Sequence, residues 1–206
     1  MAAATAGLIL AGGLSRRMGG GRKGLLEVGG VPLLRRVRDV LAPQCAPLLL
    51  NANGDAGGLA GFGLPVVADT VPDFAGPLAG ILAGLEFLRA HHPGIVWMAS
   101  APVDAPFLPD DFAARLHAAR GGAAMACAAS GGRAQPVAAL WPVGLADELR
   151  DYLDGGGRRA MDFVLRHGAA VAKWEIAARD PFFNINTPED LAKANAPPGS
   201  LTPSVS

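Results

Sequence analysis

Cysteine is scarce in this sequence, and its two cysteines do not form a metal-binding pattern. Cys45 and Cys127 are the only ones in 206 residues, and their spacing fits no zinc or iron–sulfur motif. A chain that needs no disulfides suits a reducing compartment, so we expect a cytoplasmic protein. No segment approaches the roughly 20 apolar residues of a membrane-spanning helix, and no basic residue precedes the apolar N-terminal run as a signal peptide requires.

An excess of charge of either sign is also missing. Eighteen basic and eighteen acidic residues cancel, so the overall charge gives no indication of nucleic acid or a membrane as a partner. The charge is instead local, because residues 15–38 contain seven Arg or Lys and Glu27 as the only acid. The 28 glycines follow no fixed period, which excludes collagen-like and repeat architectures.

Short apolar runs alternate with segments in which apolar residues recur at helical spacing. Helices are predicted around Leu33–Leu41 and Leu78–Leu88. The predicted strands are residues 7–11, 47–52, 64–69, 95–100 and 124–129. Strands that are almost entirely apolar are typical of a parallel sheet with both faces covered. The sequence therefore predicts an α/β fold with a single doubly wound, mostly parallel sheet and helices on both faces.

The pattern continues less regularly after residue 130. Strands are predicted at 135–142 and 170–176, and helices at 144–156, 159–168 and 186–195. In the last helix Thr187 is the expected N-cap, with Asp190 three residues later. No linker divides the chain, so we expect one domain over residues 1–196 and a disordered tail over 197–206.

The loop after the first strand, within "LILAGGLSRRMGGGRKGLL" (8–26), combines flexible backbone with positive charge. It contains six glycines, three arginines and one lysine, with no acid. "GRKGLL" lacks the GK[ST] ending of a Walker loop, and "GGGRKG" begins eight residues after the strand, too late for a dinucleotide fingerprint. Gly12 and Gly13 still allow close approach of the backbone to a ligand, and the basic groups can cover a triphosphate. The alternative is an ordinary solvated loop.

Polar residues stand at or shortly after the carboxyl ends of three of the predicted strands. Asn51, Asp69 and Asp104 therefore belong to the carboxyl edge of the sheet, where open α/β sheets bind ligands. Asp104 lies between Pro102 and Pro106, which restrict its backbone, and a carboxylate held there suits Mg²⁺. Each of the three could instead be a cap or turn residue.

The same motifs carry a family resemblance. "LILAGGLSRRMGG…K", "GPLAGI" (76–81), "PVDAP" (102–106) and "NINTPEDL" (184–191) together resemble the molybdenum cofactor guanylyltransferases, over roughly residues 6–195. Members of that family transfer GMP from GTP to molybdopterin and release pyrophosphate. The resemblance implies a Rossmann-like nucleotidyltransferase fold, Mg²⁺ as cofactor, and GTP and molybdopterin as partners, with molybdoenzymes or cofactor-delivery proteins as further candidates.

The resemblance also implies roles for individual residues. Asp104, Lys23 and Arg17 are the expected catalytic residues, and Asp104 is also the metal ligand. The nucleotide site comprises Leu10, Ala11, Gly12, Gly13, Lys23, Asn51, Asp69 and Asp104. The pterin side comprises Gly76, Gly80, Arg158, Arg159, Asn184 and Asn186, where the last two point to one side of an extended segment. One departure is Arg22, which stands where the family commonly has an acidic residue.

Two other functions remain open from the sequence. One is a sister cytidylyltransferase, although "LAGG" resembles the guanylyl enzymes more than the "LAAG" typical of the cytidylyl ones. The other is a non-catalytic GTP-binding homologue, which would bind GTP without releasing pyrophosphate.

Overall fold

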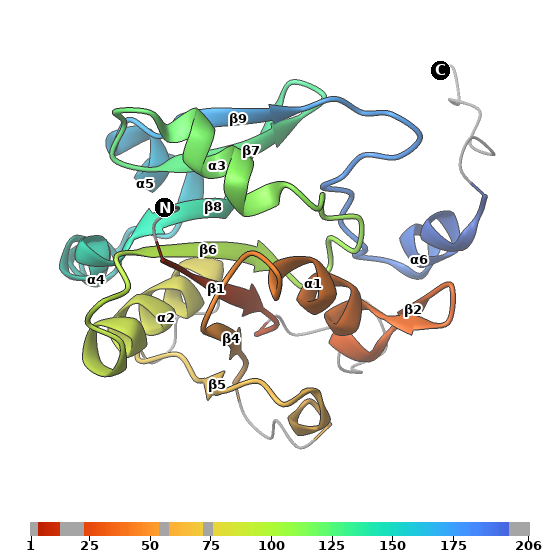
Figure 1. Cartoon of the computed structure of the whole chain (residues 1–206), viewed down its shortest axis with the longest axis horizontal. Coiled ribbons are helices and arrows are strands. Elements are labelled where there is room, and N and C mark those ends of the chain that lie inside the picture. Colours follow the sequence, from red (N-terminus) through yellow and green to blue (C-terminus); the bar gives the residue numbers. More distant parts are fainter. Residues whose placement is uncertain (1–3, 13–22, 54–57, 72–75, 198–206) are drawn as a thin grey trace.

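A seven-stranded sheet forms the centre of the molecule (Figure 1). The computed structural model describes residues 4–12, 23–53, 58–71 and 76–197. In this part of the chain the strand order is β5-β4-β1-β6-β8-β7-β9, and β8 alone runs antiparallel to its neighbours. The strands are β1 (Thr5–Leu10), β4 (Leu48–Asn51), β5 (Val66–Val67), β6 (Trp97–Pro102), β7 (Ala126–Ser130), β8 (Arg133–Pro142) and β9 (Ala170–Trp174).

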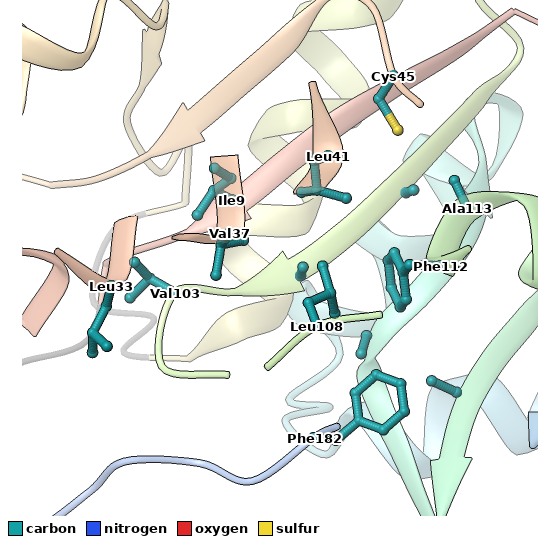
Figure 2. Close-up of a cluster of buried hydrophobic side chains, with 14 of the residues drawn as sticks. Ile9, Leu33, Val37, Leu41, Cys45, Val103, Leu108, Phe112, Ala113 and Phe182 are labelled. Atoms are coloured by element: carbon teal, nitrogen blue, oxygen red, sulfur yellow. The ribbon is translucent and has the colours of Figure 1, made fainter. Parts of the chain in front are cut away.

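Helices cover both faces of this sheet (Figure 1). One face carries α1 (Leu33–Leu41) and α3 (Phe112–Arg120), and the other carries α2 (Pro77–His91), α4 (Ala146–Asp154) and α5 (Ala160–Arg166). Alternate residues of β1 point to opposite faces, so Ile9 packs in the first core and Leu8 in the second. Figure 2 shows the first core, in which Val37 and Leu41 of α1 lie near Ile9, and Phe112 of α3 lies near Leu108 and Phe182. The predicted doubly wound sheet is therefore confirmed.

The remaining elements are short or lie beside the sheet. Strands β2 (Glu27–Val28) and β3 (Val31–Pro32) form a hairpin, and α6 (Pro188–Asn195) packs beside it. Single turns of 3₁₀ helix are η2 (Lys23–Leu25), η3 (Ala60–Phe62) and η4 (Val143–Leu145). The predicted tail lies outside the described residues from 198 onward. No helix in the described ranges has both the length and the apolar character needed to cross a membrane.

Three parallel strands end side by side at one edge of the sheet. Leu10, the last residue of β1, pairs with Asn51 of β4 and with Pro102 of β6. The hydrogen-bond pattern of the sheet continues one residue beyond β1 and β6, because Ala11 N donates to Asn51 O at 2.9 Å and Val103 N donates to Leu10 O at 3.0 Å. This register brings the residues that follow β1, β4 and β6 to a common edge.

Candidate active site

One half of the candidate site is a network of amides around the Asp69 carboxylate. Asn51, only 3% exposed, donates its Nδ2 to Val67 O at 3.1 Å and to Asp69 Oδ1 at 2.8 Å. Asn53 donates its Nδ2 to Asp69 Oδ2 at 2.7 Å and accepts from Asp69 N at 2.9 Å. An amide therefore holds each oxygen of Asp69, which fixes the orientation of this carboxylate.

Two glycines leave room for the Asn51 side chain, and the space at Gly80 is the tighter of the two. A Cβ on Gly12 would lie 3.1 Å from Asn51 Oδ1 and 3.6 Å from Asn53 Nδ2. A Cβ on Gly80 of α2 would lie 2.2 Å from Asn51 Oδ1 and 2.6 Å from Asn51 Cγ, which is closer than real contacts allow. Gly80, expected on the pterin side, thus lies directly against the nucleotide-side residue Asn51.

The other half of the site is centred on Lys23, at the start of η2. Its Nζ donates to Asp104 Oδ2 at 2.5 Å and to Asn186 Oδ1 at 2.7 Å. The side chains of Lys23 and Asp104 are only 15% and 18% exposed, so this ion pair is largely shielded from solvent. The structure therefore brings Asn186, which was expected on the pterin side, together with two residues that were expected to be catalytic.

The segment that carries Asn186 is fixed by the start of α6. Ile185 is buried and donates its backbone N–H to Asp104 O at 3.0 Å, whereas Asn184 and Asn186 are exposed, in agreement with the predicted alternation. Asp190 Oδ2 accepts from the backbone N–H groups of Asn186 and Thr187, each at 3.0 Å. The first of these hydrogen bonds is the main reason why the pKa of Asp190 is lowered. Together with the Thr187 side chain they complete the capping box that the sequence predicts.

The second carboxylate oxygen of Asp104 is the candidate ligand for the expected Mg²⁺. Asp104 Oδ1 is buried and has no hydrogen-bond partner among the described residues. The described ranges contain no group of three or more His, Cys, Asp or Glu arranged to hold a metal ion. One carboxylate oxygen nevertheless fits Mg²⁺, because this cation takes one or two protein carboxylates and completes its shell with water and phosphate oxygens.

The other residues expected on the pterin side lie near the ends of α2, α4 and α5. Gly76 precedes α2 and is exposed. Arg158 donates to Leu153 O at 2.9 Å and to Gly157 O at 2.7 Å, which shapes the turn after α4. Arg159 is exposed, and its carbonyl accepts from Tyr152 at 3.1 Å. These contacts leave the assignment to the pterin side as a prediction.

Three residues singled out in the sequence, Gly13, Arg17 and Arg22, lie outside the described residues. Asn53 was not predicted, and the available signal was its position two residues after Asn51, where a strand ends.

Comparisons with known proteins show which family the chain belongs to. The family model described as "MobA-like NTP transferase domain" matches residues 7–171. The chain belongs to this family. Among its family relatives, the molybdenum cofactor guanylyltransferase of Rhodopseudomonas palustris (strain BisB5) is 55% identical over 194 residues, covering 93% of this chain and 92% of the relative. The protein of the same name from Bradyrhizobium sp. (strain ORS 278) is 52% identical over 194 residues, covering 93% and 92%.

Solved structures show the same fold. Molybdopterin-guanine dinucleotide biosynthesis protein A from Archaeoglobus fulgidus has a TM-score of 0.70 at 24% identity, over 92% of this chain and 96% of that chain. 4-Diphosphocytidyl-2C-methyl-D-erythritol synthase from Anaerococcus prevotii has a TM-score of 0.72 at 14% identity, over 93% and 94%. The resemblance and the fold predicted from the motifs are both confirmed.

Proposed function

We propose that this chain transfers GMP from GTP to molybdopterin, releasing pyrophosphate and forming the guanine dinucleotide form of the cofactor. The observation that carries the proposal is the pairing of Lys23 with Asp104 beside the fixed Asn51–Asp69 pair, at the edge where β1, β4 and β6 end. Relatives about half identical over most of their length bear the guanylyltransferase name, which supports GTP as the donor.

In this reaction a phosphate oxygen of molybdopterin attacks the α-phosphorus of GTP. A new P–O bond forms, the bond from the α-phosphorus to the α,β-bridging oxygen breaks, and pyrophosphate leaves with that oxygen. Such a transfer depends mainly on positioning and on neutralising negative charge. Dedicated acid and base residues are less necessary for this chemistry, which fits the four histidines, because they form no motif.

We assign the roles of the residues in line with the family resemblance. Asn51 and Asp69 orient the nucleotide, and the backbone of Leu10, Ala11 and Gly12 lines its approach. Lys23 neutralises phosphate charge. Asp104 would hold Mg²⁺ with the carboxylate oxygen that Lys23 leaves free, and the ion would supply positive charge to the phosphate oxygens. Gly13 and Arg17 complete the triphosphate site in this proposal, and Asn184, Asn186, Gly76, Arg158 and Arg159 belong to the acceptor side.

The proposal is tested with purified protein, Mg²⁺, molybdopterin-type cofactor, and either GTP or CTP, with pyrophosphate as the readout. We expect pyrophosphate to be released with GTP and not with CTP, and only when the molybdopterin-type acceptor is present. Release with CTP would assign the chain to the cytidylyl reaction instead. GTP binding without release, in an assay that a competent guanylyltransferase passes, would favour a non-catalytic homologue.

Replacing Asp104 by Asn tests its place in this mechanism. We expect turnover to fall by about 10²–10³-fold, as when a charge-stabilising group is removed from an active site. The circular dichroism spectrum should stay unchanged, because the polar shape of the side chain is kept. Asp110→Asn is the matched control, since Asp110 lies six residues away in the same loop and is exposed. Near-normal turnover of Asp104→Asn would remove this residue from the mechanism.

A further inference from the structure

Lys23 and a divalent cation require the same carboxylate. The Lys23 ammonium contacts two oxygen atoms, Asp104 Oδ2 and Asn186 Oδ1, and both are of the hard type that Mg²⁺ prefers. The carbonyl of Asp104 and the N–H of Ile185 join the same two segments at 3.0 Å, which keeps both oxygens in place. Lys23 therefore occupies a small oxygen-lined position that is built by residues far apart in the sequence.

A cation on the remaining oxygen of Asp104 would meet the ammonium at short range. Asp104 Oδ1 belongs to the same carboxylate, and the pair is largely shielded from water, so the repulsion between the two cations is weakly screened. One carboxylate charge cannot compensate an ammonium and a divalent ion together. A polyphosphate changes this balance, because its negative charges can neutralise both cations at once.

We infer that Lys23 competes with the divalent cation for Asp104, so that the metal binds weakly alone and binds well together with the nucleotide. This inference rests on the proposed function, and it adds a role to Lys23 beyond contact with the phosphates. Lys23 opposes the metal before the nucleotide arrives and assists the nucleotide afterwards. The coupling makes the protein select the metal–nucleotide complex over the free ion.

The test uses electron paramagnetic resonance to measure how tightly Mn²⁺, without nucleotide, binds to the full chain and to its Lys23→Met variant. We expect the variant to bind Mn²⁺ roughly tenfold more tightly, within the range typical of coupling between two ligands. The same variant should bind α,β-methylene GTP more weakly than the original chain. A purely structural role for Lys23 would weaken both, so the opposite signs of the two changes are diagnostic.

Three further variants make the result specific. Lys173→Met removes one positive charge at an exposed position of β9 and should leave Mn²⁺ binding unchanged. Lys23→Gln keeps a hydrogen-bond donor without the charge, and it replaces Lys23→Met if that variant has a lowered unfolding midpoint. The double variant Lys23→Met/Asp104→Asn should lose the gain in Mn²⁺ affinity.

Equal or weaker Mn²⁺ binding by folded Lys23 variants would overturn the inference, and so would a gain that survives Asp104→Asn. The pyrophosphate assay is independent of this readout. An inactive chain that still shows the gain would refute the proposed transfer and keep the competition between Lys23 and the metal.

Discussion

Asn53 has an exposed side chain but makes two hydrogen bonds to Asp69, one through each end of its amide. We expect Asn53→Ala to raise the Kd for GTP by about 2- to 10-fold, the range that corresponds to one modest hydrogen bond, because Asp69 loses its orientation. The rate at saturating GTP should change little, since Asn53 is a positioning residue. Isothermal titration calorimetry with GTP and steady-state kinetics measure the two effects.

The matched comparison for Asn53 is Asn53→Asp. A second carboxylate facing Asp69 adds repulsion between like charges, so its Kd for GTP should exceed that of Asn53→Ala. Unchanged affinity in both variants would show that Asp69 does not need this support.

Substitutions at two buried glycines of α2 distinguish an effect on the candidate site from a general effect on core packing. Gly80→Ala places a methyl group 2.2 Å from Asn51 Oδ1, whereas Gly84→Ala places one 2.9 Å from Leu8 Cδ2 and from Met98 Sδ. We expect both variants to lower the unfolding midpoint in urea, and Gly80→Ala alone to weaken GTP binding, because it displaces Asn51. Equal GTP affinity in the two folded variants would contradict this role of Gly80.

The residue positions that could be predicted from the sequence are those to which a local rule applies. Asn51 and Asp104 were placed at the candidate site because Asn51 ends one strand and Asp104 follows another, and parallel strands end at one edge. The pairing of Lys23 with Asn186 was not predictable in the same way, because 163 residues separate them and no local pattern connects them. The whole fold decides that contact.

At the scale of elements, α6 connects two parts of the Lys23 region. Its first turn holds Asn186, which accepts from Lys23. At its other end Asn195 accepts from Gly29 N at 2.8 Å, within the β2–β3 hairpin that follows Lys23. The helix therefore fixes both the partner of Lys23 and the hairpin after it.

Removing the acidic residue of the α6 capping box tests this connection. We expect Asp190→Ala to lower the free energy of unfolding by about 1 kcal/mol, the usual value of an N-terminal capping interaction, and to raise the KM for GTP because Asn186 moves. The folded-state pKa of Asp190 is lowered, so its stabilisation is present above its ordinary pKa of 3.8 and is lost as the pH falls through the folded value. Urea denaturation at neutral pH and initial rates supply both numbers.

Glu189→Ala is the control for this change, because Glu189 is the neighbouring acid in the same first turn and is exposed. It should affect the KM for GTP less than Asp190→Ala does. The same KM shift in both variants would point to loss of charge rather than to the position of Asn186.

The predicted elements differ from the observed ones where periodicity carries no information. The strand expected at 95–100 is observed two residues later, as β6 (Trp97–Pro102). The bounds differ because apolar character does not mark where the ladder of hydrogen bonds begins. The direction of β8 depends on its neighbours and could not be deduced from its own residues. Helix α3 was not predicted, although Phe112, Ala113 and Leu116 form its buried side, because its alanines and basic residues dilute the apolar pattern.

At the scale of the whole molecule, the two edges of the sheet have different chemistry. The candidate site lies where β1 ends, whereas His117 accepts or donates a 2.7 Å hydrogen bond with Thr5 where β1 begins. The strand has six residues, so its two ends, one at the candidate site and the other at the His117–Thr5 contact, are about 17 Å apart along its axis. His117 also lies edge-on to Trp97, with a centroid distance of 5.8 Å, and the Arg120 guanidinium lies 4.7 Å over the same ring.

This arrangement predicts how the stability of the whole fold depends on pH. Burial, and secondarily the charge of Arg120, lowers the pKa of His117 below its ordinary value of 6.5. The unfolded chain therefore binds a proton more readily than the folded one, and stability falls as the pH drops from about 6.5 through the folded pKa. His117→Gln removes this titration, so urea midpoints measured between pH 7.5 and 5.5 should decline less in the variant than in the original chain. Because His117 is at the opposite edge from Lys23, GTP affinity at pH 7.5 should be the same in both proteins. Parallel declines in the two midpoints would mean that another group controls the acid sensitivity.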